Sequence, residues 1–210
     1  MRFIDLSHPM RDGQPSFPGD PILSIVAHST IENRRCNVSR LSMGSHQGTH
    51  LDAQYHFVHD GRKVEEMPLD WFYGPARLLR IPKPPRAEIT VSDLKPFEQI
   101  LLPGARIIYE TGWHRHYGLS DYFTDFPSLT QEAASYLAGL RIRLLGMDTP
   151  TPSRDYYEVH HLLLEKNVEM VIVESLANLD SLPDQFLFIG FPLHIGGGDG
   201  SPIRAVAGIE

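Results

Sequence analysis

Short apolar segments rich in branched residues recur along this chain, and each is bounded by Gly, Pro or Asp. Segments of this length and composition are typical of β-strands. The pattern predicts strands at Ile22–Val26, Ala76–Ile81, Ala105–Tyr109, Ile142–Leu145, Val168–Val173, Phe186–Ile189 and Ile203–Val206.

Two segments instead carry helical signals. Ser128 and Gln131 have the spacing of a capping box ahead of a helix over Glu132–Leu140. A second helix is predicted over Tyr156–Lys166, where leucine and histidine repeat at helical spacing. The second half then alternates strand, helix, strand, helix, strand, which favours an α/β fold with a mixed sheet and packed helices.

Composition limits the classes to which the protein can belong. The 210 residues include 41% hydrophobic and 21% charged residues, and the 17 prolines fall between apolar segments, so we expect one domain over residues 1–210. The net charge of -7 comes without a cluster of Lys and Arg, which argues against nucleic acid as a partner.

Cellular location is the next inference from composition. The single cysteine, Cys36, excludes a disulfide framework and suits a reducing cytoplasm. No signal peptide is expected at the N-terminus, and no apolar stretch approaches the roughly 18 residues of a membrane span. We therefore expect a cytoplasmic protein without a membrane partner.

The candidate chemistry lies in a short segment with three histidines and an aspartate, namely His46, His50, Asp52 and His56. Imidazole nitrogen and carboxylate oxygen are ligands of zinc. In a regular helix Asp52 would point well away from His46, and in a regular strand His46 and His50 would be roughly 13 Å apart. Convergence requires a bend, which Gly48 could provide through a positive φ. The alternative is a polar loop that happens to contain some of the 11 histidines.

Further ligand candidates occur in the second half of the chain. His160 and His161 lie on the predicted helix, and Glu174 ends an apolar strand. A carboxylate in that position is costly unless it is paired or bound to a cation. The alternatives are a solvated Glu174 and histidines that face solvent, and the sequence does not choose between His160 and His161.

The pattern His-x-Gly-Thr-His-x-Asp-x-x-x-His from His46 to His56 resembles the signature of the metal-dependent cyclase-like hydrolase family, which includes bacterial kynurenine formamidase and isatin hydrolase. The resemblance covers nearly the whole chain. It is also carried by Ile4–Met10, Pro15–Pro21, Gly112–Trp113, Gly146–Pro150, Glu174–Leu179 and Asp199–Ala205.

The resemblance implies a swivelling β/β/α fold and a role for each candidate. His46, His50 and Asp52 match metal ligands, Asp52 matches a carboxylate that can bridge two ions, and His160 and Glu174 match ligands of the second ion. His56 matches the catalytic histidine. The family is usually dimeric or tetrameric, with a neighbouring subunit that helps to close the substrate pocket.

The activity implied is that of an arylformamidase, which hydrolyses the small amide N-formylkynurenine to kynurenine and formate in tryptophan catabolism. Alternatives are hydrolysis of isatin or another cyclic amide or lactone, and a non-catalytic metal-binding protein. Zinc is the first choice for one or two ions, and manganese also suits the carboxylate-rich set. His56 would transfer protons, since its unperturbed pKa lies near 6.5.

Several features differ from the pattern of the formamidases, and the stretch between His160 and Glu174 is about two residues longer than usual. Gln54 replaces an expected proline, which could loosen the loop. Phe17 replaces a common tryptophan and retains an aromatic surface for binding substrate, and Trp113 and Tyr55 are further candidates to line the pocket. Thr151–Arg154 replaces a Ser-Lys element, which leaves the chemistry better supported than the substrate.

Overall fold

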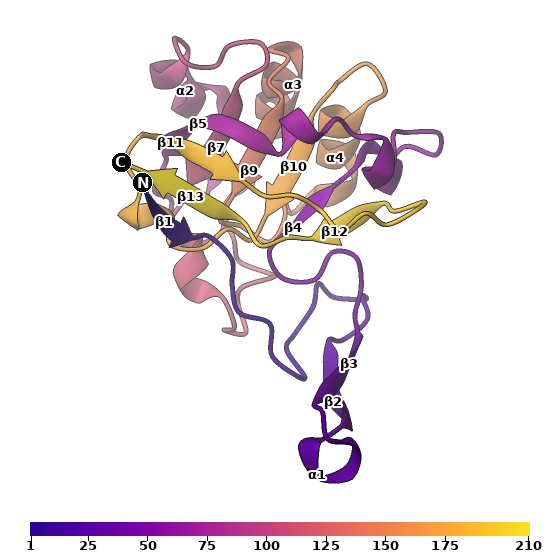
Figure 1. The fold of residues 1–210 in the computed structure, drawn as a ribbon. Helices are drawn as coiled ribbons and strands as arrows, with labels where there is room; N and C mark the ends of the chain where they lie inside the picture. The colour runs from indigo at the N-terminus through magenta and orange to yellow at the C-terminus, as the bar shows by residue number, and fades with distance from the viewer.

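The computed structural model describes residues 1–210 and is built on a curled nine-stranded mixed sheet (Figure 1). The strand order is β1-β13-β11-β5-β7-β9-β10-β4-β12. Its strands are β1 (Arg2–Asp5), β4 (His50–Asp52), β5 (Tyr73–Arg80), β7 (Arg106–Glu110), β9 (Leu144–Met147), β10 (Val171–Glu174), β11 (Gln185–Ile189), β12 (Gly200–Pro202) and β13 (Val206–Ile209). The α/β fold with a mixed sheet, expected from the sequence, is confirmed.

The remaining elements are short. Two small sheets pair β2 (Ser24–Ser29) with β3 (Val38–Ser42) and β6 (Glu88–Ile89) with β8 (Ser128–Leu129). The α-helices are α1 (Ile31–Arg34), α2 (Val91–Leu94), α3 (Gln131–Gly139) and α4 (Tyr156–Leu164). The 3-10 helices are η1 (Gln54–His56), η2 (Val64–Glu66), η3 (Leu69–Trp71), η4 (Lys95–Phe97), η5 (Trp113–His116) and η6 (Leu179–Ser181).

The central strands are parallel because helices connect them. Strands β5, β7, β9 and β10 run parallel to one another, and α3 and α4 lie in the connections from β7 to β9 and from β9 to β10. The other neighbours in the sheet pair antiparallel. These pairs are β1 with β13, β13 with β11, β11 with β5, β10 with β4, and β4 with β12. Alternation of helix and strand in the second half therefore follows the prediction.

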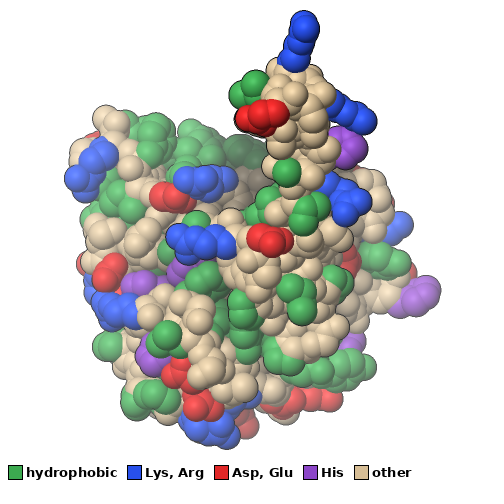
Figure 2. Space-filling view, turned by 90° about the horizontal axis from the view of Figure 1, so that it is seen from below, with side chains coloured by type: hydrophobic (Ala, Val, Ile, Leu, Met, Phe, Trp, Pro, Cys, Tyr) green, Lys and Arg blue, Asp and Glu red, His purple; other side chains and the backbone are tan.

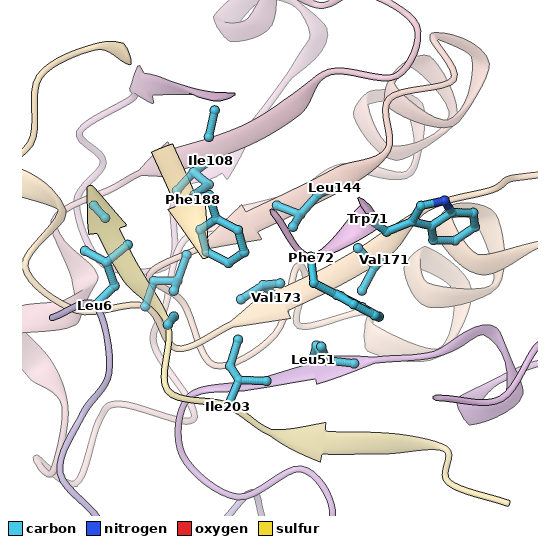
Figure 3. Close-up of a cluster of buried hydrophobic side chains, with 14 of the residues drawn as sticks. Leu6, Leu51, Trp71, Phe72, Ile108, Leu144, Val171, Val173, Phe188 and Ile203 are labelled. Carbon is cyan, nitrogen blue, oxygen red and sulfur yellow. The ribbon is translucent and has the colours of Figure 1, made fainter. Parts of the chain in front are cut away.

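Side chains that alternate along the buried strands build two hydrophobic clusters, one on each face of the sheet. In β7, Ile107 and Tyr109 pack with residues of α3 and α4, whereas Ile108 packs on the other face. This second face is filled by the cluster in Figure 3, where Phe72, Val173 and Phe188 point into the space enclosed by the curl. The core thus fixes the ends of β4 and β10, where the candidate ligands lie.

Several predicted boundaries are wrong. The last strand is Val206–Ile209 and not Ile203–Val206, because Ile203 pairs instead with Pro192 and donates its N–H to Thr49 O. Helix α3 is capped by Thr130 and not by Ser128, since the Thr130 side chain accepts the hydrogen bond from Ala133 N. Strand β10 begins at Val171, three residues later than predicted.

Strands β2 and β3 form an arm, residues 22–42, which extends away from the body (Figures 1 and 2). The predicted strand Ile22–Val26 overlaps β2 but lies in this arm and not in the core, and Ile22 is 68% exposed. None of the helices is long and apolar enough to cross a membrane.

Candidate functional site

The segment from His46 to Asp52 bends, as its ligand spacing requires. Gly48 adopts φ +64°, a value that glycine accepts at little cost. The chain then enters β4 at His50, whose partner in β10 is Glu174. Because alternate residues of a strand share one face, His50 and Asp52 point the same way, and the bend returns His46 towards them.

Asp52 lies at the centre of the resulting cluster and is fully buried. Its Oδ1 is 2.8 Å from His46 Nδ1 and 3.4 Å from His50 Nε2. Its Oδ2 is 3.4 Å from His160 Nε2. Glu174 completes the cluster, with 3.3 Å from Oε2 to His50 Nε2 and 3.2 Å from Oε1 to His160 Nε2. Five of the six site residues expected to bind metal or move protons therefore converge here.

Backbone contacts orient two of these imidazoles. His50 Nδ1 lies 2.8 Å from the Gly48 carbonyl oxygen, and His160 Nδ1 lies 2.6 Å from the Tyr156 carbonyl oxygen. A carbonyl oxygen accepts only, so each Nδ1 carries a proton and donates it. In the neutral rings this leaves the lone pair on Nε2, the atom that faces the carboxylates, which is how metal-binding histidines are commonly oriented.

The cluster has the donor set and spacing of a cation site. Two ligand atoms that each lie about 2.0–2.2 Å from one ion are separated by roughly 3.0–3.5 Å, which matches the contacts of 3.2–3.4 Å here. Asp52 Oδ2 is buried without a hydrogen-bond partner. Two sets of ligand atoms, His46-His50-Asp52 and Asp52-His160-Glu174, share this one carboxylate. The residues therefore fit one or two divalent ions.

The charges of the site favour cations. Burial lowers the pKa of His50, but hydrogen bonds and charge from Asp52 and Glu174 outweigh burial and raise it to about 10. The same balance raises the pKa of His160 to about 9, and at His46 the partners Asp52 and Asp199 raise it to about 9. Protons and metal ions thus compete for the same nitrogens.

His56 lies beside this cluster on η1. Its ring stacks on His46, with centroids 3.8 Å apart and planes 24° apart, and its Nδ1 is 3.8 Å from Asp199 Oδ2. Burial lowers the pKa of His56, although the charge of Asp52 acts in the opposite direction. His56 therefore differs from the other three histidines in being neutral at physiological pH.

The structure distinguishes His160 from His161. His160 is buried in the cluster, whereas His161 packs its ring edge against Phe57 and Tyr157. Of the two histidines, His160 is therefore the one that lies among the candidate ligands.

Gln54 tightens the loop that it was expected to loosen. The side chain is buried, and its Nε2 donates to the carbonyl oxygens of Val168 at 2.8 Å and Glu165 at 3.1 Å. These contacts tie η1 to the connection between α4 and β10, so both sides of the cluster are held together.

A cavity of about 330 Å³ opens above the cluster. Phe17, the predicted substrate-binding residue, lines it and packs edge-on against Phe123 and Tyr156. Trp113 and Tyr55 were wrong candidates for this lining. Trp113 is buried in a separate core cluster with its Nε1 donating to Tyr122 O, and Tyr55 faces outward beneath Lys63.

Asp199 is a site residue that the sequence argument did not single out. Its Oδ2 lies 3.2 Å from His46 Nε2, and this hydrogen bond holds the pKa of Asp199 well below its ordinary value. The next residue, Gly200, pairs with Asp52, and a Cβ there would lie 2.5 Å from His46 Cε1. The sequence signal for this contact was the glycine that follows Asp199, because only glycine lets the backbone at position 200 approach His46 so closely.

Comparison with known proteins agrees with this geometry. A family model described as "Putative cyclase" matches residues 4–154. The chain belongs to the cyclase family.

Relatives of this cyclase-family chain include "Kynurenine formamidase" of Bacillus cereus, 33% identical over 97% of this chain and 96% of the relative. The protein of the same name from Bacillus anthracis is 32% identical, covering 98% and 96%. The chain is thus a kynurenine formamidase-like hydrolase of carbon-nitrogen bonds other than peptide bonds.

Solved structures show the same fold. Isatin hydrolase A from Labrenzia aggregata, bound to benzyl benzoate, superposes with a TM-score of 0.87 at 27% identity over 98% of this chain and 93% of its own. A potential metal-dependent hydrolase with cyclase activity gives a TM-score of 0.82 at 25% identity, covering 98% and 96%. The family and fold implied by the His46–His56 motif are therefore confirmed.

Proposed function

We propose that this cyclase-family chain is an arylformamidase that hydrolyses N-formylkynurenine to kynurenine and formate, a step of tryptophan catabolism. The observation that carries the proposal is the single buried carboxylate, Asp52, shared by two sets of metal-ligand atoms below a cavity lined by aromatic side chains. Relatives named kynurenine formamidase, matched over nearly their whole length, support the choice of substrate.

In this proposal His46, His50 and Asp52 hold one divalent ion, and Asp52, His160 and Glu174 hold a second. Zinc is the first choice, and manganese also suits the carboxylate-rich set. The chemistry that a bound ion supplies is Lewis acidity, which lowers the pKa of water from about 15.7 towards about 7 and polarises a carbonyl group.

His56 is the proposed proton-transfer group. Its lowered pKa leaves the ring neutral at pH 7, so it can accept a proton as the amide carbonyl is attacked. An anilide nitrogen leaves poorly as an anion, so the same ring would return the proton to that nitrogen as the bond breaks. Nε2 is the atom assigned to this transfer, because Nδ1 faces Asp199.

The cavity wall is proposed to position the aromatic ring of the substrate. Phe17 and Phe123 meet edge-on with centroids 6.1 Å apart, an arrangement that leaves ring faces for a planar ligand. Phe17 is therefore assigned to substrate binding.

Hydrolysis of a cyclic amide is the second candidate function. The fold likeness to isatin hydrolase A at 27% identity favours it, and the same ligand set would serve ring opening. A substrate panel separates the two. We expect metal-loaded protein, checked by elemental analysis, to hydrolyse N-formylkynurenine with a higher kcat/KM than isatin. The reverse ranking would favour the second candidate, and no hydrolysis of either compound would overturn both.

The exposed arm of residues 22–42 supports a homodimer or homotetramer. Its two strands pair only with each other, and Val38 and Leu41 are 46% and 55% exposed. Figure 2 shows the arm standing clear of the body with basic side chains near its free end. We propose that a second copy covers these apolar side chains, because an unpartnered two-stranded hairpin is marginally stable in water.

The remaining assignments follow the same proposal. Two hydrophobic clusters on opposite faces of one sheet support a single domain over residues 1–210. Cys36 is a free, exposed thiol, which suits the reducing cytoplasm.

A further inference from the structure

The side chain of Tyr117 is fixed in the cavity wall by two residues of the N-terminal loop. His8 stacks on the Tyr117 ring, with centroids 3.6 Å apart and planes 3° apart. Gln14 Nε2 donates a hydrogen bond to the Tyr117 hydroxyl oxygen. Tyr122 packs edge-on against the same ring at 5.0 Å. A tyrosine with its ring stacked and its oxygen anchored presents its hydroxyl in one place.

The proton of this hydroxyl is free. The bond from Gln14 uses a lone pair of the oxygen, and the structure gives the hydroxyl no acceptor for its own proton. Burial raises the pKa of Tyr117 to about 12, so the phenol stays protonated in the physiological range. By contrast, the hydroxyl of Ser16, which also lines the cavity, is hydrogen-bonded to Pro21 O and Gln47 Oε1.

The hydroxyl lies beside Gly48, at the bend of the ligand loop, since a Cβ added to Gly48 would be 3.4 Å from it. Its hydrogen-bond partner is Gln14 and its ring contacts His8 and Tyr122, so no hydrogen bond or ring contact joins Tyr117 to the imidazoles and carboxylates of the metal cluster. A substrate whose amide lies at the cluster would therefore meet Tyr117 with a different part of its structure.

The cavity lining offers that part no Lys or Arg, and its neutral O–H donors include Tyr117, Tyr156 and Thr151. Among these hydroxyls, that of Tyr117 is the one whose ring is stacked and whose oxygen accepts a hydrogen bond. A keto or carboxylate oxygen of the substrate beyond the scissile amide would thus find in Tyr117 a neutral donor that is already fixed in place.

We propose that Tyr117 is a specificity-determining residue whose hydroxyl donates a hydrogen bond to an acceptor oxygen of the substrate remote from the bond that is hydrolysed. The inference rests on the proposed arylformamidase function. It adds a second recognition point outside the metal cluster, and it gives the His8 and Gln14 contacts a role in substrate choice.

The test compares two substrates in the metal-loaded protein. N-formylkynurenine carries a ketone and a carboxylate beyond the formamide, whereas formanilide has the same formamide on an aromatic ring and neither acceptor. Tyr117→Phe keeps the ring that stacks on His8 and removes only the hydroxyl. We expect it to lower kcat/KM for N-formylkynurenine about 10-fold or more, mainly through KM, and to leave formanilide turnover unchanged.

Tyr136→Phe is the matched control, because it removes a buried hydroxyl from α3 outside the cavity lining. Metal content and melting temperature should match the wild type in both variants. Wild-type protein that hydrolyses both substrates, with Tyr117→Phe losing nothing or losing equally on both, would overturn this inference and leave the proposed function standing. Wild-type protein that does not hydrolyse N-formylkynurenine would overturn the proposed function and this inference with it.

Discussion

Asp52 is held from one side by His46, whose Nδ1 lies 2.8 Å from Oδ1, while the second oxygen, Oδ2, is buried without a hydrogen-bond partner. An acceptor of this kind is costly inside a protein unless a cation reaches it. The two oxygens therefore give Asp52 a part in both proposed ion sites, which no other residue of the cluster shares.

Substitutions in the cluster should remove metal in a pattern that follows this sharing. Asp52→Asn should lose both ions, because each set of ligand atoms includes its carboxylate. His46→Ala should lose mainly the first ion, and His160→Ala mainly the second. Metal stoichiometry of the purified variants by mass spectrometry checks the pattern. Full metal content in Asp52→Asn would contradict the assignment.

Removal of the proposed proton-transfer group should separate chemistry from metal binding. His56→Ala should reduce kcat for N-formylkynurenine by about 10²- to 10⁴-fold while metal content stays at the wild-type level. His161→Ala is the matched control, since His161 lies outside the cluster and should keep full turnover. Normal turnover by His56→Ala would exclude His56 from the role.

Metal binding should release protons at neutral pH. In the metal-free chain the pKa of His50 is raised to about 10, and those of His46 and His160 to about 9, so all three rings are protonated at pH 7. Each must lose its extra proton to bind an ion, so affinity should rise with pH up to about 9–10 and fall as pH is lowered. Calorimetry of zinc binding in two buffers of different ionisation enthalpy measures the protons released. Buffer-independent heats would contradict the prediction.

Loss of the Gln54 contacts should weaken both the fold and the site. Gln54→Ala leaves the carbonyl oxygens of Glu165 and Val168 without their amide donor, which should lower the free energy of unfolding by about 1–3 kcal/mol. Turnover should fall as well, because η1 carries His56. Urea unfolding and kinetics of the same preparation measure the two effects. Unchanged stability would show that the contacts are dispensable.

The arm should control the oligomeric state. Leu41→Asp introduces a charge on the apolar surface that a second copy is proposed to cover, and it should shift the protein towards the monomer. Leu102→Asp is the control, because Leu102 is similarly exposed, at 57% against 55%, but lies on the body. Light scattering after size-exclusion chromatography gives the masses. A monomeric wild type would contradict the proposed assembly at once.

The spacing of the candidate ligands predicted more of the geometry of the site than the hydrophobic pattern predicted of the strands. His46, His50 and Asp52 lie close in sequence, so their convergence reduced to one bend, and Gly48 was the only residue placed to supply it. Strand β4 was not predicted because it has three residues, two of which, His50 and Asp52, are polar. Its hydrophobic signal is a single leucine.

The contact between Asp199 and His46 could not be predicted from spacing along the chain, because the two residues are far apart in sequence. Asp199 reaches His46 only because β12 pairs with β4 in a register that sets Gly200 opposite Asp52. Register between strands so far apart in sequence depends on packing of the whole sheet. The arm illustrates the same limit, since an apolar strand pattern does not distinguish a core strand from one in an exposed arm.

Strand β1 depends on β13 for its place in the sheet. Arg2 lies opposite Ile209, and β13 alone joins β1 to the rest of the sheet. Contacts between residues so far apart in sequence form slowly. We infer that β1 joins the sheet late in folding, so a chain clipped before Val206 would bring His46, His50 and Asp52 together while its first strand stays unpaired.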